Sequence, residues 1–487
     1  IPRVGYKRNE WLAEFKAGIR DYKKGFDLVE EGYRKYSKNG QAFICPSMWF
    51  QPTIILPPSD LQWLLDQPSH NVVQPIVQSH TNRTHNYLPC LPRTELFHAT
   101  AIRVDLRRIM TTQTRGMWRR IGTTIDHLFS PTGDDGDWTA VDVAATAKAV
   151  ALRSIVRAFF GEELSSDAAF ASDLAAFSAL FNGTIIPQFF FVPGAVKPLL
   201  APLFALPARL YVRRINRKLI PIVERLLAEA ERGDGACQWL AEPRDVVQLH
   251  VAAARRKPED RDARRIASRL LLIVGAAAID TTFGGISNAL LDLASGPTGR
   301  GEAGQAEEGG ETTGEKKWMP PPPLLPALVH ADSFVREVLR RRTFLARQVY
   351  RIVVAEGGLP LPEHSCGSGS VAPKGTWLAQ PSASVHWDDE VWEEAEAFKP
   401  WRFVDKASDP PATLPNSAST TPSEAFLSFG KGRHTCPGRF FATDVMKLTL
   451  AYIALQYEVK PLPERPPNYK VGDTYFVPAA KIEVRRR

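Results

Sequence analysis

The chain has 487 residues, of which 44% are hydrophobic and 23% charged, an ordinary globular balance with enough length for a large core or several domains. Its net charge of +8 would suit nucleic acid, anionic lipid or an acidic protein as a partner. Because no arginine-rich stripe with interleaved aromatic residues appears, we expect no nucleic-acid partner.

The cysteines and the start of the chain bear on its compartment. The five cysteines are scattered, odd in number and without CxxC spacing, which argues against a disulfide framework and for a reducing compartment. No apolar run is expected to be as long as a membrane span, and no signal peptide opens the chain at Ile1-Pro-Arg-Val-Gly5.

Apolar periodicity and turn residues divide the first 210 residues into predicted elements. Helices are expected over residues 9–37, from Pro57-Pro-Ser-Asp60 onward, and over 94–129, 137–160 and 166–181, with two short strands at 42–46 and 51–57. Residues 185–210 are very apolar but interrupted by prolines, so we expect no straight spanning helix there. A buried lid, a segment at a membrane interface and a proline-rich core connection are all compatible with this composition.

The strongest predicted helix covers residues 261–295. Small residues at 275–278 would let a large body lie against it, and Asp280 and Thr281 follow directly. A carboxylate and a hydroxyl in an otherwise apolar helix need partners, because unpaired buried polar groups cost free energy. Either these residues belong to a site or they form a solvated end of the helix.

The chain changes character after this helix. Residues 296–326 are rich in Gly, Glu and Thr and end in a run of prolines, so we expect a disordered or extended insertion without a catalytic role. A helix is expected at 332–343, where Glu337 and Arg340 lie one turn apart and can pair. A strand is expected at 347–350.

A cysteine in a glycine-rich loop is the feature with the clearest chemistry. Gly430, Gly432 and Gly438 let the backbone turn tightly, and the segment after Cys436 has a helical apolar rhythm. The sulfur therefore lies at or just before a helix N-terminus, where N–H groups and the helix dipole stabilise a thiolate. Such a thiolate suits a soft metal such as haem iron, and the alternative is a loop with a buried free thiol.

The run Phe429-x-x-Gly432-x-His434-x-Cys436-x-Gly438 resembles the haem-binding loop of the cytochrome P450 superfamily at every fixed position. The resemblance implies that Cys436 is the axial thiolate ligand of the iron of haem b. It also implies that His434 hydrogen-bonds a haem propionate and that Phe429 packs near the sulfur. Gly430 and Gly438 belong to the same cofactor-binding loop.

Two further stretches resemble motifs of the family, in the family's order. The run Ala277-Ala278-Ile-Asp280-Thr281-Thr282 is similar to its oxygen-binding motif. The resemblance implies that Ala277 and Ala278 line the cofactor site, that Ala278 leaves room for dioxygen, and that Asp280 and Thr281 manage protons. Glu337, Arg340 and Arg402 together resemble the family's structural Glu-Arg-Arg triad.

The resemblance also suggests contacts to the haem propionates. Arg347 resembles the strand arginine that reaches a propionate, and Trp118 with Arg119 resembles the tryptophan-basic cluster of a propionate-contacting helix. The family's second basic position in that helix is Gly122 here. Trp118 as a core residue beside a solvated arginine face stays open as the alternative.

The resemblance implies a mostly α fold with a small β-rich lobe, in a single catalytic domain over residues 1–487. Haem is then expected between the Asp280 helix and the Cys436 loop. The chain is most similar to the fungal microsomal group, which includes ent-kaurene oxidase-like and other secondary-metabolite enzymes. By that resemblance we expect an N-terminal anchor that is missing from this sequence, further membrane contact by residues 185–210, and location at the endoplasmic reticulum membrane with the catalytic domain facing the cytosol.

The implied reaction inserts one oxygen atom from O2 into an apolar, terpenoid- or polyketide-like secondary metabolite. The implied electron donor is NADPH-cytochrome P450 reductase, whose acidic face would meet Lys431, Arg433 and Arg439. Three alternatives stay open. The same site could catalyse oxidative coupling, desaturation or rearrangement. The chain could instead be a non-catalytic haem-binding protein, or a binding protein without haem.

Overall fold

The described helices and strands separate into two compact units, each assembled from segments far apart in the chain. The structure is a computed structural model, which describes all residues except 8, 49–50, 75–86, 89–96, 130–136, 185–196, 233–237, 256–259, 296–327, 406 and 409. Unit 1 consists of residues 1–79, 333–436 and 467–478, and unit 2 of residues 80–332, 437–466 and 479–487.

Unit 1 is built on a five-stranded sheet with the order β1-β2-β8-β5-β3. Its strands are β1 (Phe43–Cys45), β2 (Thr53–Ile55), β3 (Val72–Val73), β5 (Gln348–Val353) and β8 (Trp377–Gln380). The β2–β8 pair is parallel and the other pairs are antiparallel. An irregularity interrupts β5 between Gln348 and Arg351, where Val349 has a φ of 55°. This β-bulge changes the direction in which the flanking side chains point.

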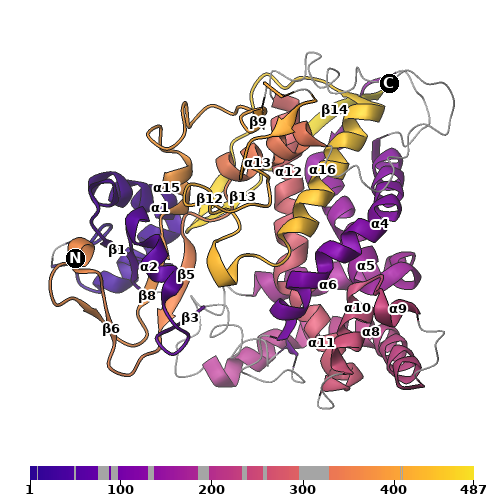
Figure 1. Ribbon diagram of the computed structural model, residues 1–487, viewed down its shortest axis with the longest axis horizontal. Helices are drawn as coiled ribbons and strands as arrows, with labels where there is room; N and C mark the ends of the chain where they lie inside the picture. Colours follow the sequence, from indigo (N-terminus) through magenta and orange to yellow (C-terminus); the bar gives the residue numbers. More distant parts are fainter. Residues whose placement is uncertain are drawn as a thin grey trace. The chain divides into compact units, whose positions relative to one another are not determined.

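The remaining elements of unit 1 surround this sheet and are short, apart from one helix. They are α1 (Ala13–Lys35), η1 (Ser37–Asn39), η2 (Pro58–Asp60), α2 (Leu61–Asp66), β6 (Leu359–Pro360), α14 (Glu363–Cys366), β7 (Val371–Ala372), α15 (Ser382–His386), β9 (Val404–Asp405), β10 (Ala412–Thr413), η8 (Gly432–His434), β12 (Tyr469–Val471) and β13 (Thr474–Phe476). Helix α1 packs against β12 and α15 (Figure 1). Gly25 permits this contact, because a Cβ there would lie 2.3 Å from the carbonyl oxygen of Gly472.

Unit 2 is mostly helical. Its helices are α4 (Phe97–Phe129), α5 (Val143–Ser165), α6 (Ala168–Gly183), α8 (Lys197–Arg232), α9 (Gln238–Ala241), α10 (Val246–Ala254), α11 (Ala263–Ile273), η5 (Val274–Ala278), α12 (Ile279–Ser295) and α16 (Arg439–Gln456), and α13 (Val329–Arg341) begins in it and continues into unit 1. A three-stranded antiparallel sheet joins β4 (Thr139–Asp142), β11 (Tyr457–Val459) and β14 (Lys481–Arg486).

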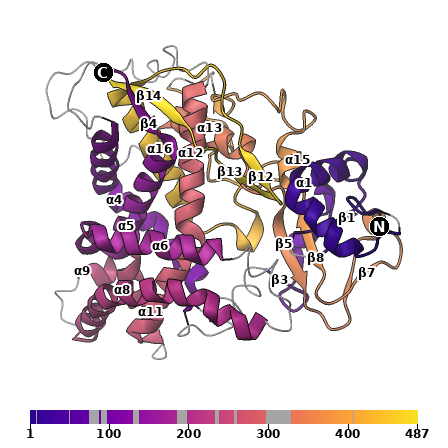
Figure 2. The same ribbon diagram turned by 180° about the vertical axis from the view of Figure 1, so that it is seen from behind.

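A continuous helical segment, Ala263–Ser295, forms the centre of unit 2, with η5 as one π-helical turn between α11 and α12. Its α12 part runs beside α5 and α16 (Figure 2). Two glycines permit close packing against this segment because they lack a Cβ. A Cβ at Gly275 would lie 2.3 Å from the Phe177 ring, and one at Gly285 would lie 3.0 Å from the sulfur of Met446. By length and composition this segment could cross a membrane, so the prediction of no sufficiently long apolar run was wrong. A core helix meets the same criterion.

Most predicted elements of the described chain are confirmed, and two differ. The prolines predicted to interrupt residues 185–210 do not stop α8, which contains Pro202 and Pro207, while 185–196 lie outside the described residues. Residues 139–142 form β4 rather than the start of a helix, because they pair with β14 and Asp142 then caps α5 by accepting a hydrogen bond from the N–H of Ala145 at 2.8 Å. The insertion predicted at 296–326 lies outside the described residues.

Candidate active site

The Cys436 loop in unit 1 is a sequence of tight turns closed by backbone hydrogen bonds. The N–H of Gly430 donates to the carbonyl of Leu427 at 2.8 Å, and the N–H of Cys436 donates to the carbonyl of Phe429 at 2.9 Å. Gly430 and Gly432 have φ of 66° and 77°, the left-handed region that side chains disfavour. The Cys436 thiol is partly exposed and forms no disulfide. The loop therefore presents an accessible sulfur on a backbone that is held in place.

Open space lies on one side of the Cys436 loop, and the loop also carries a positively charged side chain. A Cβ at Gly430 would meet no atom within 4 Å. Arg433 donates through Nη2 to the carbonyl of Gln67 at 2.7 Å and through Nε to Nε2 of His434 at 3.1 Å. Because Nε2 of His434 accepts this bond, the proton of the neutral ring lies on Nδ1.

The side chain of Arg347, the predicted propionate ligand, is bound by other residues of unit 1. It is fully buried, pairs with the carboxylate of Asp21, and donates through Nη1 to the carbonyl of Pro46 at 2.9 Å. A second carboxylate, that of Asp473, lies 4.0 Å from its Nε. These contacts tie strand β5 to α1 and to the β12–β13 turn, which is a structural role.

Arg351 lies on β5, and the sequence patterns assign no role to it. It is 1% exposed, and its Nη1 donates to the carbonyl of Tyr350 at 2.8 Å, whereas its Nε and Nη2 have no partner in the described chain. Burial, together with the neighbouring charge of Arg433, lowers the pKa of Arg351 to about 10. Two donors without an acceptor beside a second guanidinium indicate a place for an anion.

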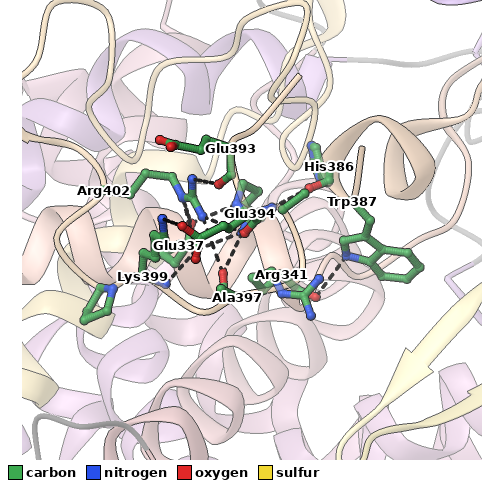
Figure 3. A network of polar contacts seen from close by, with 12 residues as sticks. Glu337, Arg341, His386, Trp387, Glu393, Glu394, Ala397, Lys399 and Arg402 are labelled. Atoms are coloured by element: carbon green, nitrogen blue, oxygen red, sulfur yellow. Dashed lines mark hydrogen bonds and ion pairs between the residues drawn. The ribbon is translucent and has the colours of Figure 1, made fainter. Parts of the chain in front are cut away.

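Glu337, Arg340 and Arg402 meet as predicted, in the network drawn in Figure 3. Arg340 donates to both carboxylate oxygens of Glu337 at 2.8 Å, and neither side chain is exposed. Arg402 Nε lies 3.3 Å from the same carboxylate, and the N–H of Lys399 donates to it at 3.0 Å. Arg402 also donates to the carbonyl of Glu393 at 2.6 Å. The network joins α13 to the segment that follows α15.

In unit 2 the second group of predicted residues lies at the π-helical turn. Ala277 and Ala278 are in η5, and Asp280 and Thr281 open α12. The π turn leaves the carbonyl of Gly275 to accept hydrogen bonds from Ser178 Oγ at 3.0 Å and Asn182 Nδ2 at 2.8 Å. Such turns are frequent at functional sites.

Asp280 and Thr281 have different partners at this turn. Thr281 Oγ1 donates back to the carbonyl of Ala277 at 2.6 Å, and Asn182 Nδ2 donates to the Asp280 carboxylate at 2.7 Å. Partial desolvation raises the pKa of Asp280 above its ordinary value, while the hydrogen bond from Asn182 opposes this shift. A carboxyl group with a raised pKa and a fixed orientation is suited to taking part in proton transfer.

Trp118 and Arg119 lie on α4 in unit 2. Trp118 is 6% exposed and its ring packs edge-on against that of Tyr452, with centroids 5.2 Å apart. Arg119 is exposed. These positions fit a core tryptophan beside a solvated arginine, so their haem-contacting role stays a prediction.

Comparison with known proteins identifies the family. The family model described as cytochrome P450 matches residues 97–484. The chain belongs to the cytochrome P450 family. Two relatives have similar length: the cytochrome P450 monooxygenase polB of Polytolypa hystricis is 28% identical over 100% of this chain and 93% of its own, and lnaC of Aspergillus flavus is 27% identical over 95% and 87%.

A solved structure supports the P450 fold. The crystal structure of a cytochrome P450DA heme domain superposes with a TM-score of 0.68 over 100% of this chain and 98% of that one, at 16% identity. The predicted mostly α fold is thereby confirmed. This P450 is an enzyme of the monooxygenase type, and membership of the family implies haem.

The residues of unit 1 fit such a group. The thiol of Cys436 is a soft donor of the kind that haem-thiolate proteins use, and the space beside Gly430 leaves the loop open on one side. The donors of Arg351 without an acceptor match the need of a propionate for buried positive charge.

Proposed function

We propose that this P450 is a haem-thiolate monooxygenase that inserts one oxygen atom from O2 into an apolar secondary metabolite of the terpenoid or polyketide kind. Cys436 is proposed as the axial ligand of the iron of haem b. The observation that carries the proposal is the loop itself: an accessible thiol on a backbone fixed by left-handed glycines and the Cys436–Phe429 hydrogen bond. When bound, haem supplies the activation of dioxygen that no side chain can provide.

The protein's own groups have separate tasks in this proposal. Cys436 holds the cofactor, and Asp280 supplies protons from a carboxyl whose orientation Asn182 fixes. Thr281 keeps its hydroxyl at the π turn through the bond to Ala277 and can hand a proton on.

Oxygen transfer tests this function directly. Purified protein with a flavoprotein reductase and NADPH is supplied with apolar terpenoid and polyketide-like compounds chosen by their spin-state shift, under labelled dioxygen. Products that carry one labelled oxygen atom, and none from Cys436→Ser, support the proposal. Labelled product from Cys436→Ser would overturn it.

Arg351, rather than Arg347, is proposed to bind a haem propionate, together with His434 through Nδ1–H. Arg351→Ala should release haem roughly ten-fold faster, as expected for the loss of one charge-assisted contact, without lowering the melting temperature of the haem-free protein. Arg347→Ala should lower that melting temperature, because it leaves Asp21 buried and unpaired. Haem transfer to apomyoglobin and a melting curve distinguish the two roles, and equal effects of both variants on haem release would contradict the assignment.

The electron donor is proposed to be an NADPH-cytochrome P450 reductase that docks through acidic residues on Lys431 and Arg433. Arg433 is exposed, and the Nζ of half-buried Lys431 lies 3.4 Å from the carboxylate of exposed Glu424. Reduction of the P450 by reductase should slow as salt rises. A rate that does not depend on salt would count against this docking mode.

Membrane association is proposed to involve α8, at the endoplasmic reticulum. Leu203, Leu206 and Leu210 are 58%, 50% and 56% exposed at helical spacing, and the exposed Arg213 and Arg217 follow on the same helix. An apolar stripe beside cations suits an anionic lipid surface. Replacing the three leucines with Ser should reduce co-flotation with anionic vesicles, whereas Val391→Ser, 40% exposed in unit 1, should not. Unchanged flotation of the triple variant would show that α8 does not contribute to membrane association.

A further inference from the structure

His386, the last residue of α15, is a polar residue in the interior of unit 1 that belongs to neither the Cys436 loop nor the Glu337 ion pairs. Its side chain is completely buried. Its Nε2 accepts a hydrogen bond of 3.0 Å from the backbone N–H of Leu427, in the segment that leads into the Cys436 loop. Because Nε2 accepts, the ring proton lies on Nδ1, which forms no well-aligned hydrogen bond in the described chain but has the backbone of Arg340 as a neighbouring partner.

This arrangement is costly if the ring serves only to fill space. A buried N–H whose hydrogen bond is poorly aligned regains only part of the hydration that it loses, whereas a phenylalanine of similar shape would avoid that loss. The ring stacks on Phe426 with centroids 5.6 Å apart and planes at 25°, a contact that a phenylalanine could also make. What the imidazole adds is the acceptor for Leu427.

The surroundings keep the ring neutral, as an acceptor must be. Burial, with the positive charges of Arg340 and Arg336 on α13, lowers the pKa of His386 to about 3. Arg336 also lies 4.0 Å from the centroid of Phe426, on which the His386 ring stacks. The hydrogen bond to Leu427 is therefore not lost by protonation at neutral pH.

The backbone of the same residue is bound to the ion-pair network. Arg340 Nη1 donates to the carbonyl of His386 while its other nitrogens hold the Glu337 carboxylate (Figure 3). On the other side, Leu427 accepts the N–H of Gly430, and Phe429 accepts the N–H of Cys436. His386 thus joins Glu337 and Arg340 to the base of the Cys436 loop through consecutive hydrogen bonds.

We infer that His386 is a positioning residue that fixes the base of the Cys436 loop, so that the sulfur stays bound to haem iron as a thiolate. The inference rests on the proposed function, because it assigns a task in holding the ligand proposed there. It predicts that removing the acceptor loosens the thiolate bond before it unfolds the protein.

The test compares variants by the spectrum of the reduced protein under carbon monoxide, which distinguishes thiolate-bound haem from haem that has lost its thiolate. His386→Phe keeps the ring but removes the acceptor, and we expect its thiolate form to convert about ten-fold faster in mild urea, the factor that one buried N–H without a partner would give. His386→Gln, whose Oε1 can take the place of Nε2, should restore most of the wild-type lifetime.

Ser333→Ala is the matched control. Ser333 Oγ accepts the buried N–H of Phe403 at 3.1 Å and donates to the carbonyl of Pro400 at 2.7 Å, on the same α13 but away from the Cys436 loop. Like His386→Phe, this variant leaves one buried backbone N–H without its acceptor. We expect a lower melting temperature with an unchanged lifetime of the thiolate form.

Each outcome decides something. Equal lifetimes for His386→Phe, Ser333→Ala and the wild type would overturn the inference and leave His386 as packing. If His386→Phe does not accumulate, His386→Asn replaces it, because its shorter side chain cannot reach Leu427, and an Asn variant as durable as the Gln variant would also overturn the inference. A wild type without the thiolate band would refute the proposed function instead.

Discussion

Glu337→Gln is expected to lower the free energy of unfolding by about 3–5 kcal/mol, the cost of removing one partner from a buried ion pair. The carboxylate has no exposed surface and accepts hydrogen bonds from Arg340, from Arg402 and from the N–H of Lys399. Glutamine leaves two guanidiniums facing a neutral amide that presents N–H groups to one of them. Since whole domains are stable by only about 5–15 kcal/mol, little folded, haem-loaded protein should accumulate.

A urea titration checks this expectation against a neighbour. Glu394→Gln removes the carboxylate that lies 2.8 Å from Lys399 Nζ, but both side chains are exposed, at 64% and 36%. Exposed pairs contribute about 0–1 kcal/mol, so this variant should unfold close to the wild-type midpoint. A loss below about 1 kcal/mol for Glu337→Gln would show that the network does not hold unit 1 together.

Asp280→Asn is expected to reduce turnover by about a hundred-fold, the lower range of what a positioned proton donor contributes. The amide keeps the shape of the side chain but cannot exchange a proton. The spectrum of the reduced protein under carbon monoxide should stay unchanged, because the variant lies outside the Cys436 loop. NADPH consumption should be coupled to product less efficiently.

Two further variants define the role of Asp280. Asp173→Asn, which removes the pair between half-buried Asp173 and exposed Arg214 at 3.6 Å, should leave turnover unchanged. Asn182→Ala removes the hydrogen bond that opposes the raised pKa of Asp280, so that pKa should rise further. If Asp280 acts in its acid form, the fall in rate at high pH should move to higher pH. Full turnover by Asp280→Asn would refute the assignment.

The residues that the sequence identified share short, fixed spacings. The turns from Phe429 to Cys436 follow from glycines with left-handed φ, and the Glu337–Arg340 pair follows from one helical turn. The small residues at 275–278 predict room for a large body against the helix, and the structure places them in the π turn, which the sequence did not predict. Local patterns of this kind can be read from the sequence because the short spacing itself determines the geometry.

The contacts that the sequence could not show depend on long-range register. A β-bulge at Val349 shifts the alternation along β5, so Arg347 is bound to Asp21 while the donors of Arg351 are left without acceptors. The low helix propensity of proline likewise predicted an interruption in α8, but the helix continues through Pro202 and Pro207.

His386 and Leu427 show the same limit. They lie 41 residues apart, and nothing in either local sequence indicates that a histidine ring accepts a backbone N–H. The signal that could have found His386 is its burial as a polar ring, which only the fold reveals.

One spectrum tests most directly whether Cys436 is the ligand of the haem iron. The purified protein is reduced with dithionite and exposed to carbon monoxide, beside Cys436→Ser. We expect the red-shifted Soret band of thiolate-bound haem for the wild type and its loss in the variant. A wild type that binds haem without this band, or a variant that keeps it, would contradict the assignment of Cys436.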